Sequence, residues 1–141
     1  MAAGARDPRP GVMTAMRVEG RTDRNFAELA RWLKPGGVLA IEQHRGNPGP
    51  QDPKAASGYV TEAYVIEAAN KVGLKLAARS EINANAKDTK DHPFGVWTLP
   101  PTRITVPYGS GKAPDPNVDR SKYDAIGESD RMTLRFVKAA R

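Results

Sequence analysis

Two histidines are the side chains of this 141-residue sequence best suited to acid–base chemistry. His44 follows the apolar run Val38–Ile41, and an imidazole at the end of a strand can accept a proton from a substrate or hydrogen-bond to it. Glu42 lies two residues before His44, so both side chains would share one face of that strand. Two ligands without a third do not define a metal site, so we expect no metal here. The alternative for His44 is a solvent-exposed histidine without a function.

The second histidine, His92, lies in a segment that combines a titratable pair with aromatic residues. Asp91 precedes it, and Phe94 and Trp97 follow it. These residues could form the wall of a substrate pocket, although a lid that covers the core would need the same aromatic side chains. The sequence has no cysteine, which excludes cysteine-based metal sites and nucleophiles, and two histidines with scattered acids do not define a serine triad. We therefore assign no catalytic residue.

The net charge of +6 is spread along the chain. Basic and acidic side chains alternate, as in residues 87–91, and no run of Lys and Arg marks a nucleic-acid surface. We expect a basic solvated surface, and nucleic-acid binding through Trp32, Trp97 and Tyr108 is an alternative that a steep salt dependence would support. The sequence has no apolar stretch long enough for a signal peptide or a membrane span. We therefore expect a cytoplasmic protein without a membrane partner, unless the natural N-terminus is longer.

An α/β domain must position these side chains. Apolar residues at a 3.6-residue period predict helices near residues 24–33 and 61–72, and Thr61 is suited to cap the second one. Asp119 could cap a short helix that runs through Ala125. Apolar runs and alternating patterns predict three strands, which are Val38–Gln43, Leu74–Ile82 and Met132–Val137.

The chain is predicted to hold one domain. Residues 1–22 show neither the helical period nor the alternation of a strand, and they are expected to be disordered. Residues 23–141 form the α/β domain, in which residues 83–118 are a long loop or lid before the last strand. The apolar residues expected to be buried together in the core are Leu39, Ile41, Val65, Leu76 and Phe136.

The order of these elements and several segments resemble a known family. The turn Leu33–Gly37 followed by Val38–Ile41 looks like the turn and fifth strand of a class I S-adenosylmethionine-dependent methyltransferase. Longer and more specific segments resemble a group of predicted bacterial methyltransferases, and they are Gly58–Leu76, Ser80–Pro101 and Gly127–Lys138. The resemblance covers residues 25–138.

The resemblance implies a partial Rossmann-like fold with a three-stranded mixed sheet, two main helices and a long insertion before the last strand. In this family the last strand inserts antiparallel between the other two. The implied reaction is transfer of a methyl group from S-adenosylmethionine to an unknown acceptor, either a small molecule or another substrate. Residues that would lie on the substrate side are His44, Arg45, Tyr59, Asn83, Asn85, Asp91, His92 and Trp97.

The family holds its cofactor on a glycine-rich turn after the first strand, and an acidic residue after the second strand binds the ribose. No such strand, turn and acid precede Asn25. We therefore expect a shortened gene product that keeps the substrate-side half and binds the cofactor weakly or not at all. The alternative function is a non-catalytic module that self-associates through an exposed sheet edge.

Overall fold

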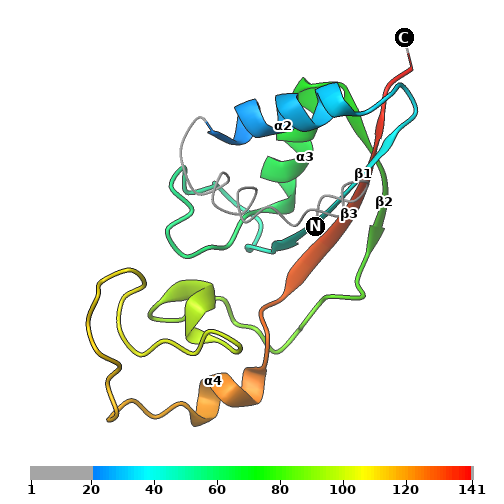
Figure 1. Ribbon diagram of the computed structural model, residues 1–141. Coiled ribbons are helices and arrows are strands. Elements are labelled where there is room, and N and C mark those ends of the chain that lie inside the picture. Colours follow the sequence, from blue (N-terminus) through cyan, green and yellow to red (C-terminus); the bar gives the residue numbers. More distant parts are fainter. Residues whose placement is uncertain (1–20, 141) are drawn as a thin grey trace.

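A computed structural model describes residues 21–140 of the chain (Figure 1). The predicted disorder of residues 1–20 lies outside the described residues. Arg21 and Thr22, which were expected to belong to that segment, are helical, and Thr22 is only 3% exposed, so tertiary contact orders this turn. The elements, in chain order, are α2 (Arg21–Trp32), β1 (Val38–His44), α3 (Glu62–Lys71), β2 (Leu74–Ser80), η1 (Gly95–Thr98), α4 (Ser121–Ile126) and β3 (Arg131–Lys138).

The strands of residues 21–140 form one three-stranded sheet in the order β1-β3-β2. β3 pairs antiparallel with both neighbours, so Ile41 lies opposite Leu134 and Leu76 lies opposite Phe136. The predicted insertion of the last strand between the other two is confirmed. The predicted mixed sheet is wrong, because β3 separates the two strands that run in the same direction and every pairing is therefore antiparallel.

The core lies between the sheet and the helices α2 and α3, which cover the same face of the sheet (Figure 1). Alternation along β1 and β3 sends Leu39, Ile41 and Phe136 to this face, where they meet Val65 of α3, as predicted. Leu76 is only partly buried, which corrects the predicted core. β2 is irregular directly after Leu76, and it is Leu74 that is fully buried.

The turn between α2 and β1 is tied to the far end of β3. Gly36 has a φ of 80°, which glycine adopts without strain, and its N–H donates to the Lys138 carbonyl oxygen at 2.9 Å. The Lys138 ammonium donates to the carbonyl oxygens of Ala30 and Leu33, each at 2.7 Å. The Ala30 carbonyl oxygen also accepts from the Leu33 N–H at 3.3 Å, so the ammonium adds to the backbone hydrogen bond that closes the end of α2. A cation there also opposes the negative end of the helix dipole.

α3 begins and ends as the sequence predicts. The Thr61 hydroxyl accepts a hydrogen bond from the Tyr64 N–H, which is the N-cap arrangement. Gly73, with a φ of 80°, follows the last turn and leads directly into β2. The crossover from β1 through α3 to β2 is therefore fixed by local sequence signals.

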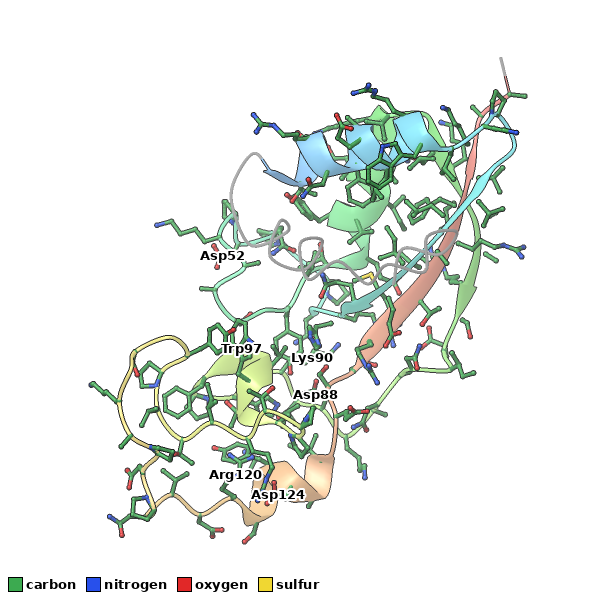
Figure 2. All side chains as sticks on the ribbon, viewed as in Figure 1. Asp52, Asp88, Lys90, Trp97, Arg120 and Asp124 are labelled. Carbon is green, nitrogen blue, oxygen red and sulfur yellow. The ribbon has the colours of Figure 1, made fainter. Side chains whose placement is uncertain are left out.

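Residues 81–120 and α4 form a lobe beyond the carboxyl end of β1 (Figure 1). Arg120 holds this lobe together by donating to the carbonyl oxygens of Thr98 and Ile104. Asp124 accepts two further hydrogen bonds from Arg103, at 2.9 and 3.0 Å, and Figure 2 shows Arg120 and Asp124 side by side. The long segment before β3 has only two short helices, and side-chain contacts to backbone carbonyls and to a carboxylate hold it together.

We expect the substitution Ile41→Ala to lower the free energy of unfolding by about 2–5 kcal/mol, since it leaves a cavity in the core. Urea unfolding followed by circular dichroism measures the change. Val38→Ala is the matched control, because Val38 lies on the same strand with 41% of its surface exposed, and its cost should stay below about 1 kcal/mol. A loss below about 1 kcal/mol for Ile41→Ala would mean that β1 is not central to the core.

Candidate functional site

The end of β1 and the start of β3 place two pairs of polar side chains on opposite sides of the sheet. Successive side chains of a strand point to opposite faces, so His44 and Arg45 diverge, as do Ser129 and Asp130. The Arg45 N–H donates to the Asp130 carbonyl oxygen at 2.9 Å, which keeps the two segments in register. His44 therefore meets Ser129 on one side, and Arg45 meets Asp130 on the other.

On the second side, Arg45 is the centre of a cluster of charges. Its guanidinium makes five hydrogen bonds, at 2.8 to 3.1 Å, to the carboxylates of Asp130, Glu62 and Glu81. Arginine has five N–H donors, so all of them are used. Lys90 adds a second cation, 2.9 Å from the Asp130 carboxylate. We call these five residues the Arg45 cluster.

The charged groups of the Arg45 cluster shift one another's pKa values. Hydrogen bonds to Glu81 and Asp130 raise the pKa of Arg45 above its ordinary value, although partial burial opposes this. Burial alone would raise the pKa of Asp130, but hydrogen bonds from Arg45 and Lys90 outweigh it and hold that pKa well below its usual range. Both groups are therefore charged over the whole physiological range.

A second buried carboxylate, Asp88, lies next to the Arg45 cluster (Figure 2). It accepts hydrogen bonds from the Tyr59 hydroxyl and from His92 Nε2, both at 2.7 Å. The backbone N–H groups of Asp130 and Lys90 also donate to it, at 2.9 Å. Burial favours the neutral form of Asp88, but these donors lower its pKa, and burial together with Asp88 raises the pKa of Tyr59.

The Arg45 cluster lines a cavity of about 660 Å³ that also borders the start of α3. Volume alone would favour this cavity as a ligand site. Its charged groups, however, are already paired with one another, because Arg45 has no donor left and Asp130 is held by Arg45, Lys90 and the Asn85 N–H. The cluster is thus arranged to hold residues 81–90 against the sheet rather than to receive a charged ligand.

On the first side, the His44 side chain faces a smaller pocket of about 270 Å³. His44 Nδ1 lies 2.5 Å from Ser129 Oγ, and which of the two atoms donates depends on the histidine tautomer. Arg131 pairs with Glu42 at 2.6 Å and with Glu128 at 3.2 Å. We call this the His44 pocket, and its lining residues are His44, Val96, Trp97, Pro100, Pro101, Thr102, Glu128, Ser129 and Arg131.

The predicted site residues are divided between these two sides. Arg45, Tyr59, Asn85 and His92 meet through Asp88 and Asp130. His44 and Trp97 line the His44 pocket instead.

Two predicted site residues lie elsewhere. The Asn83 side chain donates to Thr133 Oγ1 at 2.8 Å, on the neighbouring strand β3. Asp91 is exposed, accepts from the Thr89 hydroxyl at 2.5 Å, and has a lowered pKa because of that bond. His92 therefore pairs with Asp88 rather than with Asp91, whose carboxylate is 4.0 Å from His92 Nδ1.

Sequence reasoning missed Asp88, Ser129 and Asp130. Asp88 lies in the mixed-charge run 87–91, which is typical of a solvated surface, yet the folded chain buries it. Ser129 and Asp130 immediately precede β3, and His44 and Arg45 lie at the end of β1. Polar residues at these two strand ends are the sequence signal that could have indicated a site. That signal does not show which carboxylate meets Arg45.

The aromatic residues considered for nucleic-acid binding do not form one surface. Trp97 stacks on Tyr108, with ring centroids 4.6 Å apart and planes at 17°. Trp32 lies on α2, on the other side of the molecule from η1 (Figure 1). A continuous stacking platform with Trp32 is therefore not available.

Comparisons with family models, with curated proteins and with solved structures found no match for this chain. Within residues 21–140, no group of three or more His, Asp or Glu side chains is arranged to hold a metal ion. In the same part of the chain, none of the helices has the length and apolarity needed to cross a membrane.

We expect the protein to lose stability in acid because of Asp88 and Asp130. Their pKa values are lowered in the folded state, so the unfolded chain takes up protons first as the pH falls below about 4. Their contribution is complete above the unfolded-state pKa and is lost as the pH falls through the folded-state pKa. Urea unfolding between about pH 7 and pH 2 measures this loss.

The substitution Asp130→Asn should lower the free energy of unfolding at neutral pH by about 3 kcal/mol, because it leaves Arg45 and Lys90 with less compensation. It should also make the loss of stability in acid smaller. Glu67→Gln is the matched control, since Glu67 is exposed on α3, and it should change neither quantity. Identical acid sensitivity in Asp130→Asn and the unsubstituted chain would contradict a stabilising role for this carboxylate.

Proposed function

We propose that this chain carries the substrate-side part of a class I S-adenosylmethionine-dependent methyltransferase. The observation that carries the proposal is the sheet order β1-β3-β2, with the last strand inserted antiparallel between two strands that a helix connects. This is the arrangement that the resemblance implies for the last three strands of that family. A connection in which the last strand lies at an edge would have spoken against it.

Two local features support the same proposal. The turn Leu33–Gly37, whose sequence resembles that before the family's fifth strand, leads into β1 through Gly36 in a left-handed conformation. Polar side chains gather where β1 ends, at His44 and Arg45. In open α/β sheets this edge is where ligands bind.

Residues 21–140 do not fit the cofactor. The resembled family uses a glycine-rich turn whose backbone N–H groups approach the ligand. The first glycine after β1 is Gly46, and its N–H donates to the Val60 carbonyl oxygen at 2.7 Å instead of being open to a ligand. The cofactor cradle is therefore expected outside residues 21–140, and no step of methyl transfer is derived from them.

The second candidate function is self-association through the edge of β1. Between Val38 and Ile41, β1 pairs on one side only within residues 21–140, and Val60 covers the other side at His44 and Gly46. These contacts imply that the N–H and C=O of Ala40 point to the open side. Such an edge can pair with a strand of a second chain.

We expect S-adenosylmethionine to show no binding to the 141-residue chain at micromolar concentration in isothermal titration calorimetry. A dissociation constant in the micromolar range, worth about 8 kcal/mol, would contradict the placement of the cofactor cradle outside residues 21–140. The complementary experiment joins residues 25–141 behind the first four strands of a known class I methyltransferase. This chimera should bind the cofactor, whereas the donor segment alone should not.

A chimera that folds but does not bind would contradict the proposed lineage. The same chimera with Leu134→Asp is the matched negative control, because a carboxylate at this fully buried position of β3 disrupts the sheet. Circular dichroism distinguishes a folded chimera without affinity from one that has not folded.

Self-association is tested by sedimentation velocity over a range of protein concentrations. If the edge of β1 pairs with a second copy, Ala40→Pro should shift the chain toward the monomer, because proline removes the outward N–H. The ladder to β3 should persist, since the inward N–H groups belong to the neighbouring residues. A monomer at all concentrations, or a dimer that Ala40→Pro does not weaken, would contradict this candidate.

A further inference from the structure

The His44 pocket has one apolar wall, which Val96, Trp97 and two prolines form. The volume of about 270 Å³ lies just below the range of typical ligand pockets, so it suits a compound of about one ring. The pocket lies at the carboxyl end of β1, next to the start of β3.

The apolar wall is rigid before any ligand arrives. A Cβ atom on Gly58 would lie 2.5 Å from Val96 Cγ2 and 3.2 Å from the Trp97 ring, so the chain packs directly behind the wall. A Cβ atom on Gly95 would overlap the Ser57 backbone, and the Val96 N–H donates to the Ser57 carbonyl oxygen at 2.9 Å. The stacking of Tyr108 on Trp97 adds to this support. A preformed wall lowers the entropic cost of binding.

The polar end of the pocket consists of two groups that can both donate and accept. Ser129 is 4% exposed and lines the pocket, and its hydroxyl shares a hydrogen bond with His44. A hydroxyl group on a ligand also donates and accepts, so it can join this pair in either tautomer of His44. A ligand that only accepts hydrogen bonds, such as a carboxylate, can bind only when His44 or Ser129 directs an N–H or O–H into the pocket.

The charges along the pocket disfavour an ionic ligand. Arg131 is the cation of the lining, and its guanidinium is engaged by Glu42 and Glu128. Glu128 itself lines the pocket and repels anions, while Arg131 repels cations. The two charges offset each other within the pocket.

From this combination we propose that the His44 pocket binds a small, uncharged ring compound that carries a hydroxyl group, with the ring against Trp97 and the hydroxyl at Ser129 and His44. Naming this compound as the methyl acceptor rests on the proposed function. The binding itself does not depend on it.

Phenol is the probe for this site. The sequence has two tryptophans, so Trp32→Phe makes Trp97 the remaining fluorescent reporter. Toluene is the matched probe without the hydroxyl, and benzoate is the charged one. We expect phenol to change the Trp97 fluorescence saturably, with a dissociation constant in the millimolar range, and toluene and benzoate to bind about tenfold more weakly.

The substitution Ser129→Ala should weaken phenol about tenfold and leave toluene unchanged, a difference that a merely structural role of Ser129 would not produce. Arg135→Ala is the control on β3, the strand that follows Ser129, since Arg135 is exposed and does not line the pocket. If Ser129→Ala does not fold, amide NMR of the unsubstituted chain decides, because phenol must then shift the Ser129 and Trp97 signals.

An absence of saturation with phenol overturns the proposal, as does equal affinity for toluene, equal affinity for benzoate, or an unmoved Ser129 amide. None of these experiments contains S-adenosylmethionine. A failure here therefore concerns the ligand of the His44 pocket, whereas a failure of the chimera titration concerns the proposed methyltransferase lineage.

Discussion

The ion pair between Arg45 and Asp130 is the contact on which the arrangement of the site depends. It joins the end of β1 to the residue before β3, and through Lys90 and the Asn85 N–H it holds the segment that follows β2. Charges removed from water are costly unless each finds a partner, and here every donor of Arg45 has one. The cluster therefore orders a long segment that has little regular secondary structure of its own.

Successive side chains at the end of β1 point to opposite sides of the sheet, so this strand end contributes both to the Arg45 cluster and to the His44 pocket. Arg45 and Asp130 serve the architecture, while His44 and Ser129 remain at the surface of a pocket. The larger cavity is thus the less promising ligand site, since its polar groups are already satisfied by one another. The smaller pocket combines a fixed aromatic wall with an imidazole and a hydroxyl that share a hydrogen bond.

The sequence predicted those parts of the structure that depend on neighbours along the chain. Thr61 and Gly73 delimit α3, and the apolar run of Val38–Ile41 identifies β1. The run was expected to be covered on both faces, but only alternate residues of β1 are buried. It did not predict that Lys138 would bond the carbonyl groups at the end of α2, or that Asp88 would be buried beneath Tyr59 and His92. These contacts join residues far apart in the sequence, so no local period or spacing encodes them. The ordering of Thr22 by tertiary contact has the same origin.

The central position of β3 also has a consequence for synthesis on the ribosome. β1 and β2 do not touch each other in the sheet, and each is paired only with β3 among the described strands, as in the pairing of Val38 with Val137. β3 is translated after both of them, so neither ladder can form until it leaves the exit tunnel. Until then the two strands lack their hydrogen-bonding partner and their apolar side chains stay exposed. Nascent chains in this state bind chaperones and tend to aggregate. Because its sheet is built from contacts distant in sequence, the domain should also fold slowly for its size.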